Sequence, residues 1–366
     1  MKFSLATGAH EPALRRLARE QTMPGWIRLA FPREPDWSAA QEILGRFHQT
    51  IVAADDSDSV VGCGVRAIRR AFVNETESEI GYLGGLRSLP HARRSTGLAR
   101  GYRFLRQLHE ADRRVPAYLT TIVEDNSGAA ALLTSARAGL PAYLDQGLFL
   151  SSAISLGRRR PAILPPGVEI RAGNEFPLDL ILDFLRMEGP KRQFFPSLRR
   201  EDFGTPLLRG LSPGDFRIAV RSGQIVGAAG AWDQGSFRQT LVAGYAPALR
   251  LVRPALNLAL RLAGRRPLPP PGQGLRFFHV AFLCIRDDDP AILAALLERF
   301  YAEHRNSPHE YFVVGLHERD PLRAALRRFP ALHYASRVYL ACWDDGRAFC
   351  DSLDPRLVPH LETAML

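Results

Sequence analysis

Residues 79–100 have the sequence EIGYLGGLRSLPHARRSTGLAR, and their pattern decides the fold of the first half of the chain. A strand is expected over residues 79–89. It ends at Pro90, where a basic, glycine-containing turn leads into a helix over residues 97–111. The helix is indicated by apolar side chains that recur on one face, namely Leu98, Tyr102, Leu105 and Leu108.

The turn between this strand and this helix suits an anionic group. The first turn of a helix exposes unpaired backbone N–H groups and the positive end of the helix dipole. Gly97 and Ala99 leave room for a diphosphate to approach the backbone. Arg93, Arg94 and Arg100 add positive charge. The sequence therefore predicts a diphosphate-binding turn.

Strands and helices alternate through the rest of the first half. Strands are expected over residues 3–6, 48–54, 59–74, 117–123 and 141–153, and helices over residues 11–21, 38–46 and 127–138. The polar segment DDSD turns a hairpin between the second and third of these strands.

The second half repeats this order of elements. Val61-Gly62 matches Val226-Gly227, and Tyr118-Leu119 matches Tyr311-Phe312 at an offset that is 28 residues larger. An insertion at residues 246–272 explains the difference. An ordered series of matches of this kind indicates a duplicated α/β unit.

The motif Arg94-x-x-Gly97-x-Ala99 resembles the acyl-CoA pyrophosphate loop of GCN5-related N-acetyltransferases, the GNAT superfamily. That loop has the pattern Gln/Arg-x-x-Gly-x-Gly/Ala. The resemblance implies an α/β fold of the α+β type, made of two tandem acyl-CoA N-acyltransferase-like domains. Each would be a mixed, mostly antiparallel sheet flanked by helices, with a degenerate second copy. We expect a first domain over residues 1–156, a linker over 157–167 and a second domain over 168–366.

The same resemblance implies a set of binding residues. Backbone groups of Leu86, Arg87 and Ser88 would hold the acetyl carbonyl and the pantetheine arm of acetyl-CoA, the expected co-substrate. The pyrophosphate would be held along the loop, and Asn126 would contact the pantetheine end. The loop residues are Arg93, Arg94, Ser95, Thr96, Gly97, Leu98, Ala99 and Arg100.

The chemistry supported by these parts is direct attack of an amine on the thioester, which needs a neutral amine and therefore a base or a water chain. Glu79, Glu77 and Glu124 are the carboxylate candidates, and Glu77 lies in a polar turn, where it is expected to be solvated. Relatives often carry a tyrosine as general acid where this chain has Ser135, a poor acid. Tyr143, another group or solvent would then protonate the thiolate.

The equivalent turn in the second half differs in its residues and in its charge. It has no glycine and contains Asp287, Asp288 and Asp289, whose negative charges would repel a diphosphate. Carboxylates at a helix start are instead good caps, and Asp289 precedes Pro290. We therefore expect a single acyl-CoA site, in the first half. The second half is expected to complete the substrate site, support the first half or bind something else.

Composition narrows the remaining classes of function. The chain of 366 residues has a net charge of +10 and four cysteines without a CxxC pair, so buried free thiols and no metal are expected. No transmembrane run or signal peptide is evident, which favours a cytoplasmic protein. The partner is expected to be a small-molecule or peptide amine rather than nucleic acid, since no dense basic run or aromatic platform occurs. Two possibilities stay open: that the protein forms a homo-oligomer, and that it is a non-catalytic regulatory protein with this fold.

The insertion contains the helical stretch PALRLVRPALNLALRLAG at residues 247–264. Arginines and leucines recur there at helical spacing. Such a pattern is typical of a packed helix with one solvated face, and alternatively of a basic helix on a membrane surface or a partner.

Overall fold

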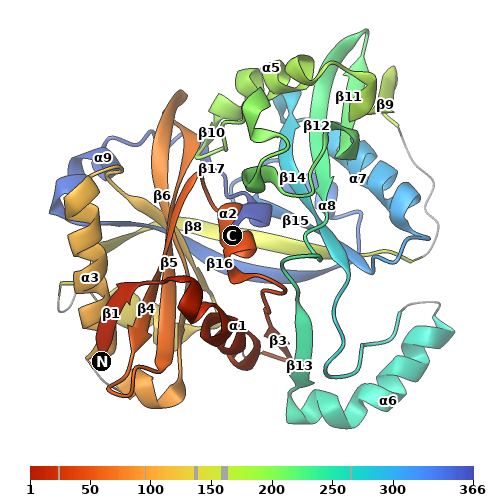
Figure 1. Cartoon of the computed structure of the whole chain (residues 1–366). Helices are drawn as coiled ribbons and strands as arrows, with labels where there is room; N and C mark the ends of the chain where they lie inside the picture. Colours follow the sequence, from red (N-terminus) through yellow and green to blue (C-terminus); the bar gives the residue numbers. More distant parts are fainter. Residues whose placement is uncertain (24, 95, 136–138, 158–163, 264–265) are drawn as a thin grey trace.

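The protein is represented by a computed structural model that describes residues 1–23, 25–94, 96–135, 139–157, 164–263 and 266–366, with the side chains of Arg93 and Arg94 left undescribed. A sheet of 12 strands runs through the whole molecule (Figure 1), in the order β1-β4-β5-β6-β7-β16-β8-β15-β14-β12-β11-β9. The first half supplies β1 (Lys2–Leu5), β4 (Phe47–Ala54), β5 (Val60–Val73), β6 (Thr76–Ser88), β7 (Tyr118–Val123) and β8 (Ala142–Ser155). The second half supplies β9 (Val168–Ala172), β11 (Phe216–Arg221), β12 (Gln224–Trp232), β14 (Phe277–Ile285), β15 (Tyr311–His317) and β16 (Ala331–Cys342).

The two halves exchange their last strands at the centre of this sheet. β16 of the second half lies between β7 and β8 of the first half, and β8 pairs in turn with β15. Each half therefore completes the sheet of the other, and the backbone hydrogen bonds of both halves form one ladder. The proposed boundaries at residues 156 and 168 stay a prediction, since most of the linker, residues 158–163, lies outside the described residues.

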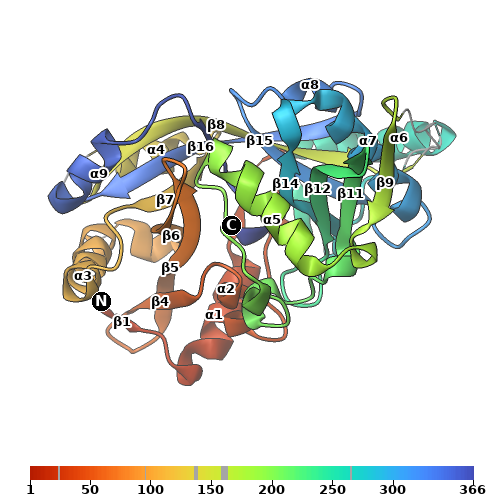
Figure 2. The same cartoon turned by 90° about the horizontal axis from the view of Figure 1, so that it is seen from above.

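Helices cover both faces of each half of the sheet (Figure 2). In the first half, α1 (Glu11–Glu20) and α2 (Trp37–Glu42) pack on one face, and α3 (Gly97–Asp112) and α4 (Ser127–Leu133) on the other. In the second half, α5 (Leu178–Glu188) lies on one face, opposite α7 (Pro290–His304) and α8 (Arg323–Leu326). The side chains of β6 alternate between the two faces of the sheet. Ile80 and Tyr82 belong to the apolar core on the α1 side, and Leu83 belongs to the core on the α3 side.

Several short elements lie outside this repeat. β13 (Leu241–Tyr245) of the second half pairs with β3 (Ile27–Ala30), which pairs with β2 (Thr22–Met23). β10 (Arg192–Gln193) pairs with β17 (Val358–Pro359). The remaining helices are α6 (Pro247–Leu262) within the insertion and α9 (Arg347–Asp351).

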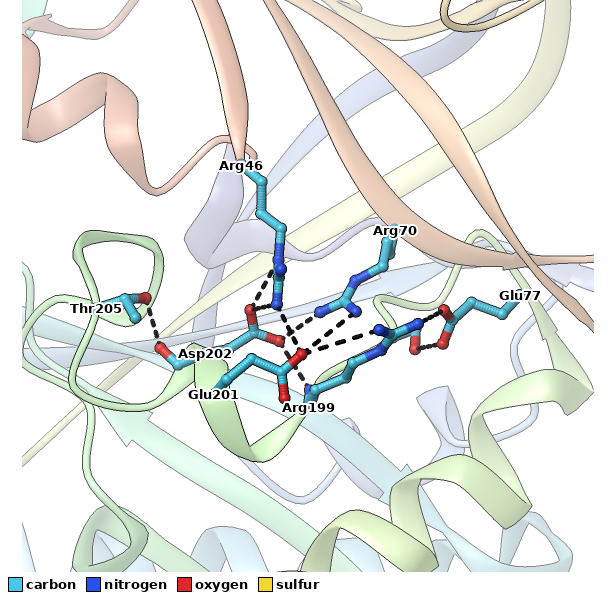
Figure 3. A network of polar contacts seen from close by, with 8 residues as sticks. Arg46, Arg70, Glu77, Arg199, Glu201, Asp202 and Thr205 are labelled. Carbon is cyan, nitrogen blue, oxygen red and sulfur yellow. Dashed lines mark hydrogen bonds and ion pairs between the residues drawn. The ribbon is translucent and has the colours of Figure 1, made fainter.

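A polar network joins the two halves beside the β5–β6 hairpin (Figure 3). Asp202, only 2% exposed, accepts hydrogen bonds from Arg46 Nε at 3.0 Å and from Arg70 Nη2 at 2.8 Å. Glu77 accepts hydrogen bonds from Ser197 and Arg199. Glu77 is exposed, as the sequence predicts, and its two partners come from a segment more than a hundred residues away.

Candidate active site

The parallel strands β6 and β7 separate to form an opening in the sheet. Their pairing is confined to Gly81 with Tyr118 and Tyr82 with Leu119, after which the strands diverge toward Ser88 and Val123. Within the diverging part of β6, Gly85 adopts a φ of 63°, where the register with β5 shifts. Such a bulge re-aims backbone groups, and glycine accommodates this φ without strain.

The closed end of this opening is packed around Tyr118. Its side chain is fully buried, and its hydroxyl is held by Arg66 Nε at 2.9 Å and His109 Nδ1 at 3.0 Å. Arg66 in turn donates to both carboxylate oxygens of Asp112, at 2.8 and 2.6 Å. A Cβ atom added at Gly81 would lie 2.1 Å from Cδ1 of Tyr118.

Replacing Gly81 with alanine should lower the free energy of unfolding by about 2–3 kcal/mol, because the ring of Tyr118 is held at its hydroxyl and has no room to move. Urea denaturation measures this loss. Gly128→Ala in α4 is the matched control, since nothing lies within 4 Å of its added methyl group. Equal stability of the two variants would show that the closed end tolerates a wider separation.

The helix α3 follows the open end of β6 along the chain. A short 3-10 helix over Pro90–Arg94 follows β6, and α3 starts at Gly97 without an acidic residue in its first turn. Among the described residues, Thr96 makes no side-chain hydrogen bond that caps this helix. An anion bound at the first turn of α3 would meet no acidic residue of that turn, as the anion-binding role requires. Of the other predicted loop positions, Leu98, Ala99 and Arg100 fall in this first turn, and Ser95 lies outside the described residues.

The remaining predicted binding residues lie along the opening. Leu86, Arg87 and Ser88 form the end of β6, beyond its pairing with β7, and the side chain of Leu86 is 54% exposed. Asn126 follows β7 and starts α4, where its Oδ1 accepts a hydrogen bond from the N–H of Ala129 at 3.2 Å.

The three predicted catalytic residues occupy different places. Glu79 is exposed and lies on the closed side of the opening, two residues before the pairing of Gly81. Glu124 lies just past the open end of β7, where it forms an ion pair with Arg337 at 3.7 Å. Tyr143, on β8, points to the α3 side of the sheet and shares a hydrogen bond with the hydroxyl of Tyr102. Burial raises the pKa of Tyr143, so this phenol stays protonated at neutral pH.

A group of three arginines, of which the sequence analysis named only Arg87, lies near Tyr82 on the other face. Arg33 follows β3, Arg87 lies on β6 and Arg238 precedes β13, and all three are half-buried. Burial, together with the neighbouring arginines, lowers the pKa of Arg33 and brings that of Arg238 to about 10. Arg238 donates to the backbone oxygen of Leu366, whereas Arg87 Nη1 has no hydrogen-bond partner among the described residues.

The second half contains a matching opening between β14 and β15. Their pairing is confined to residues 277–279 and 311–313, and Phe282 then forms a bulge with a φ of 51°. Here the backbone N–H of Phe282 donates to Glu362 at 2.7 Å. The 3-10 helix Thr363–Met365 packs against both strands.

Two of the three aspartates at the equivalent turn of the second half have partners in the structure. Asp289 caps α7 by accepting from the N–H of Ala291 at 2.9 Å, which confirms the predicted cap. Arg192 pairs with Asp288 and with Asp320, and these side chains line a cavity of about 40 Å³ beside the filled opening. The two openings therefore differ: the chain itself fills the second, and the first faces a glycine-led helix start.

No protein-family model matches this sequence, and no curated protein matches it. Among solved structures, a GCN5-related N-acetyltransferase from Sphaerobacter thermophilus is similar over 100% of this chain and 98% of that chain, with a TM-score of 0.54 and 12% identity. N-myristoyltransferase from Saccharomyces cerevisiae with bound myristoyl-CoA is similar over 93% of this chain and 79% of that chain, with a TM-score of 0.58 and 11% identity. The chain has the tandem GNAT fold, and the predicted fold class is confirmed.

Proposed function

We propose that the protein is an acyl-CoA-dependent N-acyltransferase that uses acetyl-CoA and works at the opening between β6 and β7. The observation that carries this proposal is the contrast between the two openings. The first leads to a helix start with Gly97 and no acidic residue in its first turn. In the second, the N–H of Phe282 at the bulge donates to Glu362, and the N–H of Ala291 at the start of α7 donates to Asp289. Neither N–H group is therefore available to an acyl-CoA thioester.

In the proposed reaction the nitrogen of a neutral amine attacks the thioester carbon, and the C–S bond breaks to give an amide and a thiolate. The arginine cluster around Tyr82 supports this step, because nearby positive charge lowers the pKa of an ammonium group and favours the free amine. Glu79, Glu124 or a water chain takes the proton from the nitrogen. Tyr143, whose hydroxyl is hydrogen-bonded to that of Tyr102, donates a proton to the thiolate.

Calorimetric titration with acetyl-CoA tests the binding part of this proposal, and thiol release with a panel of amines tests turnover. We expect binding and repeated turnover on at least one amine. A titration with longer acyl-CoA thioesters identifies the acyl group, since one protein with this fold was solved with myristoyl-CoA. Binding without turnover on any amine would favour the alternative, a regulatory protein that retains the fold. Absence of binding would overturn the proposal.

Tyr143→Phe should lower kcat by roughly tenfold to a hundredfold and leave the KM for acyl-CoA unchanged, because it removes the proton donor together with its hydrogen bond to Tyr102. Steady-state thiol release measures both constants. Tyr102→Phe is the control, since it removes the partner hydroxyl and keeps that of Tyr143. Equal loss in the two variants would assign the effect to packing between α3 and β8.

A further inference from the structure

The helix α6 exposes its apolar face, which is the opposite of what a surface helix of a globular protein does. None of its residues is buried. The exposed fraction is 81% for Leu251, 59% for Leu258 and 81% for Leu262. The expectation of a packed helix with a solvated polar face is therefore wrong.

The polar side of α6 is the side that faces the protein. Arg253 and Asn257 each donate to the backbone oxygen of Leu268 at 3.1 Å, and Arg253 lies over the ring of Tyr245. At 100° per residue, Leu258 and Leu262 lie on the side of the helix opposite to these contacts. The helix is thus held in an orientation that turns its leucines away from the molecule, and it projects from the body in Figure 1.

An exposed tryptophan lies next to the start of this helix. The N–H of Ala246 donates to the backbone oxygen of Trp26 at 2.9 Å, and the side chain of Trp26 is 70% exposed. Tryptophan is enriched where protein meets the interface of a lipid bilayer. We define the α6 face as the exposed side chains of Trp26, Leu251, Val252, Leu258 and Leu262.

The charge around the α6 face selects between possible occupants. The sequence has no Asp or Glu between Asp233 and Asp287, and Arg250 and Arg261 flank the leucines on exposed positions of α6. A twofold contact between two copies would bring this basic patch to both sides of the interface, and like charges repel. Among the described residues, no helix is long and apolar enough to cross a bilayer.

We propose that the α6 face docks on the surface of an anionic lipid bilayer, with the leucines and Trp26 entering the interface and the arginines contacting anionic headgroups. A basic amphipathic helix of this kind lies in the plane of the membrane. Attraction between arginines and anionic headgroups adds to the apolar contribution and is screened by salt. The proposal is independent of the acyl-transfer activity, because it rests on elements outside the opening between β6 and β7.

Co-sedimentation with vesicles tests this surface. We expect the protein to bind vesicles of phosphatidylcholine and phosphatidylserine, and to bind pure phosphatidylcholine vesicles much more weakly. The triple variant L251S/L258S/L262S should partition into vesicles at least about tenfold less. The control is L180S/M187S on α5, which removes two side chains that are 50% and 52% exposed elsewhere, and it should bind as the parent does. Arg250→Gln with Arg261→Gln should remove the preference for phosphatidylserine and the salt dependence.

Tryptophan emission supplies a second measurement. Trp37, Trp232 and Trp343 are buried, so a shift of emission on adding vesicles reports Trp26. A blue shift with anionic vesicles supports the proposal. Unchanged sedimentation of the triple serine variant would overturn it. So would a concentration-dependent dimer in light scattering that the triple variant abolishes, because the face would then belong to a second copy.

Discussion

A glutamate in place of Gly97 should weaken acyl-CoA binding by at least about a hundredfold. Its carboxylate would stand at the first turn of α3, where the proposed site holds a diphosphate. Two like charges about 4 Å apart repel by a few kcal/mol near a protein surface. The added carboxylate would also take up the helix N–H groups and the positive dipole end. Calorimetric titration with acetyl-CoA gives the dissociation constant.

Two further variants test whether the loss of binding is specific to the first turn of α3. Ala99→Glu places the same charge in the same turn at a half-buried position, and it should weaken binding even if the buried Gly97 tolerates no side chain. Ala291→Glu adds a carboxylate to the first turn of α7, the equivalent helix of the second half, at an exposed position. It should leave binding unchanged. A loss of binding in Ala291→Glu similar to that in Ala99→Glu would contradict a single site in the first half.

The order of strands and helices could be predicted because it is encoded in local patterns. The helix expected over residues 97–111 is observed as Gly97–Asp112, and the strand expected over residues 117–123 is observed as Tyr118–Val123. Alternation, helical spacing and turn residues act over a few positions and need no distant partner. The helix start at Gly97, where the diphosphate-binding turn is predicted, could be located from the same local patterns.

The strand exchange could not be predicted in this way. A strand such as β8 carries the same alternating pattern whether its neighbour is a strand of its own half or of the other half, because the pattern fixes which face is buried and leaves the edge partner open. The same holds for the arginines around Tyr82, which come from three segments. Glu362 at the bulge of Phe282 is a partner 80 residues away, and no local signal marks it.

Asp202→Asn should lower the free energy of unfolding by about 3 kcal/mol. Asp202 is almost fully buried and receives Arg46 and Arg70 from the first half, together with the N–H of Arg199 at 2.8 Å. Removing one partner of a buried ion pair leaves the other charge uncompensated, which costs several kcal/mol. Arg46 is 43% exposed and recovers part of that cost from water, so the lower end of the range is expected. Urea denaturation measures the loss.

Comparison with an exposed ion pair tests whether the burial of Asp202 causes the expected loss of stability. Asp179 pairs with Arg200 at 2.7 Å, and both side chains are more than half exposed. Asp179→Asn removes the same charge by the same substitution and should change stability little, because water screens and replaces the contact. Equal losses in Asp202→Asn and Asp179→Asn would mean that the network of Figure 3 adds little to the contact between the halves. The exchanged strands β8 and β16, the pairing of β13 with β3 and the shared apolar core would then carry that contact.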